Sequence, residues 1–294
     1  MKIIVCLKEV VDPTLNIDFG LTNRVVFREG LPLKLNPDDA TALALALDTK
    51  NASKDIEITV VSIGPESIES YLRNGLAQGA DRAVRIYDEG FDGLPPYLKA
   101  RLLTGAVKLL GADMVLTGSR SLDTSNRQVG PLMAGWLDWP CVSEVVGFEL
   151  SANRNSINLI KDLGRGEREK LSCHLPAVIT IKGERKLPYA SLDRLIESKY
   201  SGITLMSSAD LPLSPEELKN DPAVVSGLFF PRPSPRKVPP LDSSLPAFDR
   251  ILQLLAGGIA KRKGLMLQGN GDELVEQLFE LLKNEGVLRP AAGP

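Results

Sequence analysis

A polar segment from Gly118 to Pro131 carries the side chains best suited to bind a ligand. An apolar run, Met114–Leu116, precedes the segment, and apolar periodicity returns at Leu132, so the pattern is that of a strand, a loop and a helix. A helix N-terminus presents backbone N–H groups that favour a phosphate. The side chains that can donate a hydrogen bond beside it are Ser119, Arg120, Ser121, Thr124, Ser125, Asn126, Arg127 and Gln128.

The segment matches neither standard phosphate-binding motif. No lysine follows a glycine as in a Walker loop, and no Gly-x-Gly-x-x-Gly occurs in it. A long solvated loop that caps a helix fits the same spacing, because loops of this length are either functional or disordered. The spacing alone therefore leaves both interpretations open.

Other classes of chemistry have few suitable residues. His174 is the only histidine, and its position at the end of a strand-like run favours a structural role. The three cysteines, Cys6, Cys141 and Cys173, are far apart in sequence and odd in number, which is unlike a disulfide framework or a CxxC metal site. We expect no metal site and no catalytic residue.

Composition places the chain among ordinary globular proteins. Apolar residues make up 43% of its 294 residues and charged residues 24%. A net charge of -2 and an aromatic content of 5% give no basis for nucleic-acid binding. The N-terminal residues enter a strand pattern without the ordered regions of a secretory signal, and no apolar run reaches membrane-spanning length. We expect a cytoplasmic protein.

The elements that must position the polar segment alternate between strand and helix. Strands are expected at Ile3–Leu7, Ile56–Ile63, Ala83–Ile86 and Met114–Thr117, and helices at Ala40–Lys50, about 65–76 and about 96–110, with a hairpin inserted at 15–35. This alternation predicts a parallel sheet with helices on both faces. Ligands of such sheets bind beyond the carboxyl ends of the strands, where Cys6–Lys8, Ile63–Pro65 and Gly118–Gly130 fall.

The second half of the chain changes character. Hairpin strands are expected at 142–150, 156–162 and 169–173, a further strand at 177–182 and helical spacing at 189–199. The fold class is therefore α/β: a doubly wound, mostly parallel, Rossmann-like sheet with an antiparallel extension. We expect one domain over 1–200, a proline-rich extended arm over 201–245 and a C-terminal segment over 246–294 with helices at 247–255 and 272–284 and a short strand at 265–268. The arm and terminal helices could wrap a partner subunit or fold back on their own domain.

Several segments together resemble one known family. They are Lys8–Asp12, Leu35–Ala40, Val61–Pro65, Gly75–Arg82, the Gly118–Pro131 loop, Ala134–Pro140 and Leu175–Thr180. In order and spacing the chain resembles the beta subunit of electron transfer flavoprotein (the EtfB/FixA family) from residue 1 to about 200. The resemblance implies a nucleotide-binding domain similar to the adenine nucleotide alpha hydrolases.

The resemblance also implies the partners and cofactors of this subunit. It implies a heterodimer with an alpha subunit that carries FAD, an electron carrier rather than an enzyme. Electrons would come from flavin dehydrogenases of the acyl-CoA dehydrogenase type and pass to a membrane quinone reductase or another acceptor. The beta subunit would hold AMP structurally, or a second FAD in electron-bifurcating members. Direct membrane insertion is not expected.

Family contacts carried over to this sequence give a set of cofactor-binding residues. The set is Cys6, Asn36, Pro37, Asp38, Asp39, Ile63, Gly118, Ser119, Arg120, Ser121, Leu122, Asp123, Thr124, Ser125, Asn126, Arg127, Gln128 and Val129. The backbone N–H groups from Asn126 to Val129 would face the phosphate. This expectation agrees with the helix N-terminus inferred from the residues themselves.

A second resemblance concerns the dehydrogenase. In the family a leucine after the Leu-Pro-Ala strand enters an apolar pocket of the dehydrogenase, and Leu192 matches that position; the alternative is a helix residue that faces the core. Asp193 stands where the family has proline, and the lysines expected further on are reduced to Lys199. These differences indicate that the dehydrogenase could differ from the usual one.

The loop itself also departs from the family. Val129–Pro131 is similar to the bifurcating branch, yet Asp123–Asn126 replaces the Asp-Gly-Asp-Thr found there. The loss of an acid and the gain of Arg127 should favour phosphate, but they do not choose between AMP and FAD. Two rival functions on the same fold are an ATP-hydrolysing enzyme and a nucleotide-sensing protein. Leu7–Val10 lacks the Ser-Gly-Gly-x-Asp-Ser loop expected of the first.

Overall fold

A computed structural model gives the structure of the chain. It describes residues 1–12, 14, 19–20, 25–26, 32–53, 55–89, 91, 93–151, 153–213, 244–255 and 267–284. The chain divides into two compact units, Met1–Phe230 and Pro231–Pro294. The proline-rich residues 214–243 lie outside the described part of the chain.

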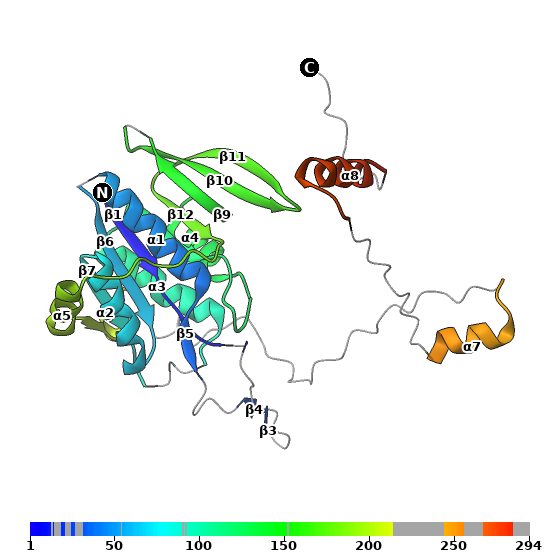
Figure 1. Cartoon of the computed structure of the whole chain (residues 1–294). Coiled ribbons are helices and arrows are strands. Elements are labelled where there is room, and N and C mark those ends of the chain that lie inside the picture. Colours follow the sequence, from blue (N-terminus) through cyan, green and yellow to red (C-terminus); the bar gives the residue numbers. More distant parts are fainter. Residues whose placement is uncertain are drawn as a thin grey trace. The chain divides into compact units, whose positions relative to one another are not determined.

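A mixed sheet forms the centre of the first unit (Figure 1). Within the described residues it has nine strands in the order β11-β10-β9-β12-β8-β1-β6-β7-β13. All neighbours from β9 to β13 pair in parallel, whereas β10 pairs antiparallel with both β9 and β11. The bounds are β1 Lys2–Cys6, β6 Glu57–Ile63, β7 Arg82–Ile86, β8 Met114–Gly118, β9 Cys141–Leu150, β10 Ser156–Gly164, β11 Glu167–His174, β12 Ala177–Ile181 and β13 Thr204–Met206. The predicted α/β fold with an antiparallel extension is confirmed.

Helices cover both faces of the sheet because the central strands are apolar on both sides. In β1, Ile3 and Val5 belong to the same buried cluster as the side chains of α1 and α2, while Ile4 and Cys6 belong to the cluster of α3 and α4. A strand buried on both faces has a continuous apolar sequence, as expected for a parallel sheet. The bounds are α1 Pro37–Ala52, α2 Glu69–Gln78, α3 Pro96–Leu110 and α4 Val129–Leu137.

The antiparallel extension begins with a corner in β9. Cys141 and Val142 pair with β12, and the register shifts before Val145. Glu144 between them has a φ of 60°, a left-handed conformation that is uncommon for a residue other than glycine. From Val145 to Leu150 the strand pairs with β10. The corner therefore places Glu144 at the carboxyl edge of the parallel sheet.

The smaller elements of the first unit agree in part with the sequence prediction. The inserted hairpin contains β3 (Phe19–Gly20) and β4 (Val25–Val26), which pair antiparallel, and β2 (Glu9–Val11) pairs antiparallel with β5 (Leu33–Leu35). Much of the hairpin predicted at 15–35 lies outside the described residues. Beyond residue 200, β13 adds an edge strand beside β7.

Helix α5 (Leu192–Tyr200) begins three residues after the start of the helical spacing seen in the sequence. Ser191 explains this start, because its hydroxyl accepts a hydrogen bond from the Arg194 N–H at 3.4 Å and so caps the helix.

The described part of the second unit consists of α7 (Ala247–Leu255) and α8 (Gly271–Asn284), where helices were predicted. A reciprocal pair of hydrogen bonds between Asn270 and Glu273 caps α8. The strand predicted at 265–268 lies partly outside the described residues, and its described residues form no strand. Among the described helices of both units, none combines the length and the apolarity that crossing a membrane requires.

Candidate functional site

The loop after β8 is held in place by the residues before α1. The Asn36 side-chain amide donates to the Arg120 carbonyl at 2.9 Å and accepts from the Leu122 N–H at 3.0 Å. The Asn36 N–H in turn donates to the Lys8 carbonyl at 2.9 Å. Asn36 is 2% exposed, so its side chain is shielded from water. One amide side chain thus fixes the path of the loop relative to the end of β1.

The two acids at the start of α1 join the ends of three parallel strands. Asp39 accepts hydrogen bonds from the N–H groups of Lys8 after β1 and Gly118 at the end of β8, both at 2.8 Å. Asp38 accepts from the N–H groups of Arg120 at 3.1 Å and Gly183 after β12 at 3.0 Å. Both are buried. Their carboxylates therefore bind the protein's own backbone and position the loop.

Burial changes the protonation of these acids. Desolvation raises the pKa of Asp39 to about 7, against the opposing effect of its hydrogen bonds to Asn36, Gly118 and Lys8. Desolvation also raises the pKa of Asp38 above its usual value. Removal of each carboxyl group from water is the main cause of both shifts.

Gly118 is required where the strand meets these acids. A Cβ atom at this position would collide with Asp39 Oδ1 and would lie 2.9 Å from both Asn36 Nδ2 and Asp38 Cβ. The backbone can approach α1 this closely only because residue 118 has no side chain.

Ion pairs hold the two ends of the loop. Near its start, Lys8 Nζ lies 2.7 Å from Asp123 Oδ1. Near its end, Arg127 pairs with Glu144 at 3.2 Å. Lys182, after β12, lies 3.2 Å from the second oxygen of Glu144 and 2.9 Å from Asp162. Arg127, Glu144, Lys182 and Asp162 therefore form a chain of alternating charges from the loop to β10.

The loop leads into α4 with free backbone donors. Ser125 and Arg127 have φ values of 49° and 57°, which turn the chain sharply before the helix. Among the described residues, no acceptor is found for the N–H groups of residues 126–130. Gly130 lets α4 approach β12 and β8, since a Cβ there would collide with Thr180 Cγ2 and lie 3.0 Å from Thr117 Oγ1. The start of α4 can therefore receive a phosphate without losing an existing bond.

The structure distributes the predicted cofactor residues over two sides of the sheet. Cys6, Ile63 and Val129 lie on the side of α3 and α4, whereas Asn36–Asp39 lie on the side of α1. Ser119 is buried and its hydroxyl is bonded to Thr180 Oγ1 at 2.8 Å. The exposed members of the loop are Arg120 and Asp123, Thr124, Ser125, Asn126, Arg127 and Gln128. These residues lie at the surface beside the free N–H groups, although Asp123 and Arg127 are in ion pairs with Lys8 and Glu144.

Three supporting residues were not found from the sequence. Glu144 donates its N–H to Ser119 Oγ at 3.2 Å and Thr180 Oγ1 at 3.3 Å and pairs with Arg127. Thr180 lies in a strand whose sequence indicates only a structural role, and the Gly183 N–H donates a hydrogen bond to Asp38 Oδ1 at 3.0 Å. A charged residue inside the strand-like stretch 142–150 was the one signal that could have indicated Glu144.

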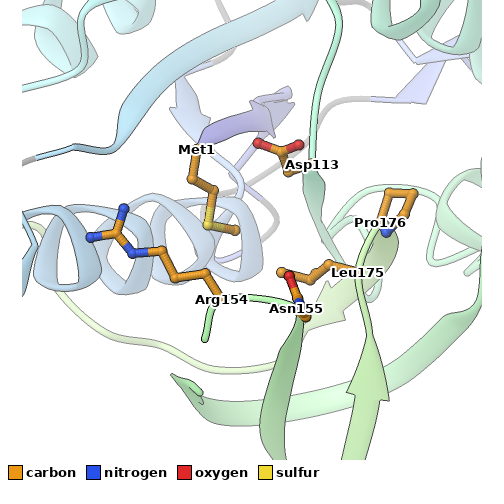
Figure 2. A pocket seen from close by; sticks show the side chains of 6 residues that line it. All are labelled: Met1, Asp113, Arg154, Asn155, Leu175 and Pro176. Carbon is orange, nitrogen blue, oxygen red and sulfur yellow. The ribbon is translucent and has the colours of Figure 1, made fainter. Parts of the chain in front are cut away.

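Among the hollows in the described part of the first unit, two differ in their position relative to the loop. One of about 500 Å³ lies beside the loop on the α1 side, and its lining includes Lys34, Pro37, Leu122 and Arg185. The other, of about 320 Å³, is lined by Met1, Asp113, Arg154, Asn155, Leu175 and Pro176, as Figure 2 shows. These residues precede β1, β8, β10 and β12, so this second hollow lies at the amino edge of the sheet. It contains none of the predicted cofactor residues.

Leu192, the predicted contact with a dehydrogenase, lies at the first position of α5. Its side chain is 71% exposed. Ile196 and Tyr200, one and two turns further on, are exposed as well, and Tyr189 before the helix is fully exposed. The side chain of Leu192 is therefore accessible to a partner and does not face the core.

Comparisons with known proteins identify the family of the chain. The sequence model of a family described as "Electron transfer flavoprotein domain" matches residues 24–190. The chain is 31% identical over 220 residues to an "Electron transfer flavoprotein subunit beta" of Methylophilus methylotrophus, covering 74% of this chain and 83% of the relative.

Two further relatives extend the likeness. The chain is 32% identical to "Caffeyl-CoA reductase-Etf complex subunit CarD" of Acetobacterium woodii, over 79% of this chain and 88% of the relative. It is 30% identical to an "Electron transfer flavoprotein subunit beta" of Thermoanaerobacterium thermosaccharolyticum, over 98% of this chain and 100% of the relative. The last alignment includes the C-terminal third, which the sequence motifs did not cover. The chain belongs to the electron transfer flavoprotein beta subunit family.

Proposed function

We propose that this chain is the beta subunit of a heterodimeric electron transfer flavoprotein and that it binds AMP as a structural nucleotide at the loop before α4. In this proposal the subunit is an electron carrier without a catalytic residue of its own. It acts in the cytoplasm together with an alpha subunit that holds FAD. Electrons reach the complex from a flavin dehydrogenase and leave to a quinone reductase or another acceptor.

The observation that carries the proposal is the row of free backbone donors at residues 126–130. Within the described residues these N–H groups have no protein acceptor, and they open a helix of nine residues. A phosphate at this position would receive several N–H groups and the favourable end of the helix dipole. The residues present thus fit the phosphate of an adenine nucleotide.

The chain's own residues then have separate tasks in binding. Asn36, Asp38 and Asp39 fix the loop backbone from below. Ser121, Thr124 and Ser125 are already joined to one another within the loop, which limits its motion before a ligand arrives. Cys6 and Ile63 lie at the carboxyl ends of β1 and β6 and belong to the apolar cluster of α3 and α4. When bound, FAD supplies the electron-carrying chemistry, and the protein supplies its position and electrostatic surroundings.

A second nucleotide is the alternative. The relative named as a subunit of a caffeyl-CoA reductase-Etf complex and the Val129–Pro131 sequence favour a second FAD at the same loop, as in an electron-bifurcating complex. The pyrophosphate of FAD could use the same N–H groups. The two proposals differ only in the nucleotide held by this subunit.

Cofactor stoichiometry tests the proposal. The chain is co-expressed with its alpha subunit, the purified complex is denatured, and the released FAD and AMP are counted per heterodimer. We expect one FAD and one AMP. Two FAD and no AMP would establish the bifurcating alternative. A chain that purifies alone without flavin, and does not form a complex, would contradict the proposal and favour a nucleotide-sensing protein.

A further inference from the structure

The charge of Arg127 is already neutralised in this structure. Arg127 lies 3.2 Å from Glu144 Oε1, although the sequence alone presents it as a cation ready to bind phosphate. The Arg127 side chain is 52% exposed, whereas that of Glu144 is 20% exposed. The Arg127 side chain is thus the more accessible of the two. An incoming phosphate must compete with Glu144 for it.

Glu144 is fixed independently of Arg127. It occupies the corner of β9 with a φ of 60°, and its N–H is held by the hydroxyl oxygens of Ser119 and Thr180. Both hydroxyl-bearing residues are buried. The carboxylate therefore stays at the carboxyl edge of the sheet when Arg127 turns away.

Glu144 keeps a positively charged partner when Arg127 is released. Lys182 lies 3.2 Å from the other carboxylate oxygen and is itself held by Asp162 at 2.9 Å. An unpaired and partly buried carboxylate would be costly, and Lys182 removes that cost. Arg127 can thus exchange one anionic partner for another at small expense.

We propose that Glu144 tunes the nucleotide site: it withholds Arg127 in the free chain and yields it to the phosphate of a bound nucleotide. Arg127 is then the side chain that binds the phosphate, and Glu144 is the residue that sets how tightly phosphate-bearing ligands bind. The inference rests on the proposed function and adds the residues that determine affinity for phosphate.

The test measures binding of AMP and of adenosine to the nucleotide-free full-length chain by calorimetry. Glu144→Gln removes the competing charge and keeps the shape, and it should tighten AMP binding about two- to fivefold, the range of a partly exposed ion pair. Arg127→Gln should weaken AMP binding about tenfold or more, as expected for the loss of a charge-assisted hydrogen bond. Adenosine lacks the phosphate, and its affinity should stay the same in every variant.

Two controls separate this exchange from a general change of charge. Asp162→Asn removes the same charge from the same network without touching Arg127, and it should leave AMP affinity within about twofold. In the double variant Arg127→Gln/Glu144→Gln, the substitution of Glu144 should no longer tighten AMP binding, because the cation that Glu144 withholds is absent. Thermal unfolding of each variant confirms that it is folded.

The outcomes are distinct. AMP binding that is unchanged or weaker in Glu144→Gln, or equally tightened in Asp162→Asn, would overturn the inference and leave the proposed function standing. An unaltered chain that binds no AMP would overturn both. An effect of Glu144→Gln that persists without Arg127 would also refute the exchange of partners.

Discussion

Asp38 and Asp39 show how buried acids can fix a loop through its backbone. Each carboxylate accepts two backbone N–H groups from segments that are far apart in sequence. Acids in the first turn of a helix also favour the helix dipole. Family likeness indicates these positions as cofactor contacts, and the structure shows that their oxygen atoms are bonded to the loop backbone. The hydrogen bonds of both carboxylates therefore fix the position of the loop.

The pKa of Asp39 predicts how stability changes with pH. Burial raises this pKa to about 7 in the folded chain, so between pH 4 and 7 the unfolded chain binds fewer protons at Asp39 than the folded chain. The free energy of unfolding should therefore fall as pH rises from 4 to 8, by roughly 1–4 kcal/mol from this group. Asp39→Asn should reduce that fall, although it also lowers stability at pH 5 because an amide oxygen replaces two acceptors. Urea unfolding across this pH range measures both effects.

Asp210→Asn is the control for this prediction. Hydrogen bonds to Ser207 lower the pKa of Asp210, so its contribution changes only below about pH 4. It should leave the fall between pH 5 and 8 unchanged. If the free energy of unfolding falls as much in Asp39→Asn as in the unaltered chain, Asp39 is not the group that causes this pH dependence.

At the scale of elements, the approach of β8 to α1 depends on one glycine. Gly118→Ala would force a Cβ atom against Asp39, Asn36 and Asp38. We expect a loss of about 1–3 kcal/mol in the free energy of unfolding, the usual cost of overpacking, together with weaker nucleotide binding because the loop starts at this residue. Chemical denaturation and AMP titration measure the two effects.

Gly135→Ala is the matched substitution in α4. Its added methyl group would meet no atom within 4 Å, and alanine favours a helix over glycine. This variant should be as stable as the unaltered chain or gain about 0.5–1 kcal/mol. Equal losses of unfolding free energy in Gly118→Ala and Gly135→Ala would mean that close packing at residue 118 does not cause the destabilisation.

The same elements show what the sequence can reveal about this fold. Ile3–Leu7 and Ile56–Ile63 are continuous apolar runs, so a parallel sheet and its helices follow from local pattern. The corner at Glu144 could not be predicted, because it depends on hydroxyl groups of Ser119 and Thr180 that are distant in sequence. The loop was found because its donors are contiguous. The residues of other strands that hold the loop could not be identified, because they come from segments that are far apart in the sequence.

At the scale of the whole molecule, apolar side chains are exposed on helices of both units. Phe248, Ile251 and Leu252 of α7 are exposed, as are Val275, Leu278 and Phe279 of α8. In the first unit, Leu192 and Tyr200 of α5 are exposed in the same way. Exposed apolar surfaces of this kind mark sites of association. They suit a subunit that works inside a larger complex.

Leu192 provides the prediction that tests association with a dehydrogenase. It is 71% exposed at the start of a capped helix, so its side chain is presented without cost to the core. Leu192→Ala should slow reduction of the flavoprotein complex by its dehydrogenase roughly tenfold or more at limiting concentration, as loss of a buried anchor does. FAD and nucleotide content should stay unchanged, because Leu192 makes no hydrogen bond with the loop before α4.

Leu109→Ala on α3, where the leucine is 53% exposed, is the matched control and should leave the rate unaltered. Equal rates in the two variants would show that the dehydrogenase binds elsewhere, and loss of FAD from Leu192→Ala would instead assign the residue to the contact with the alpha subunit.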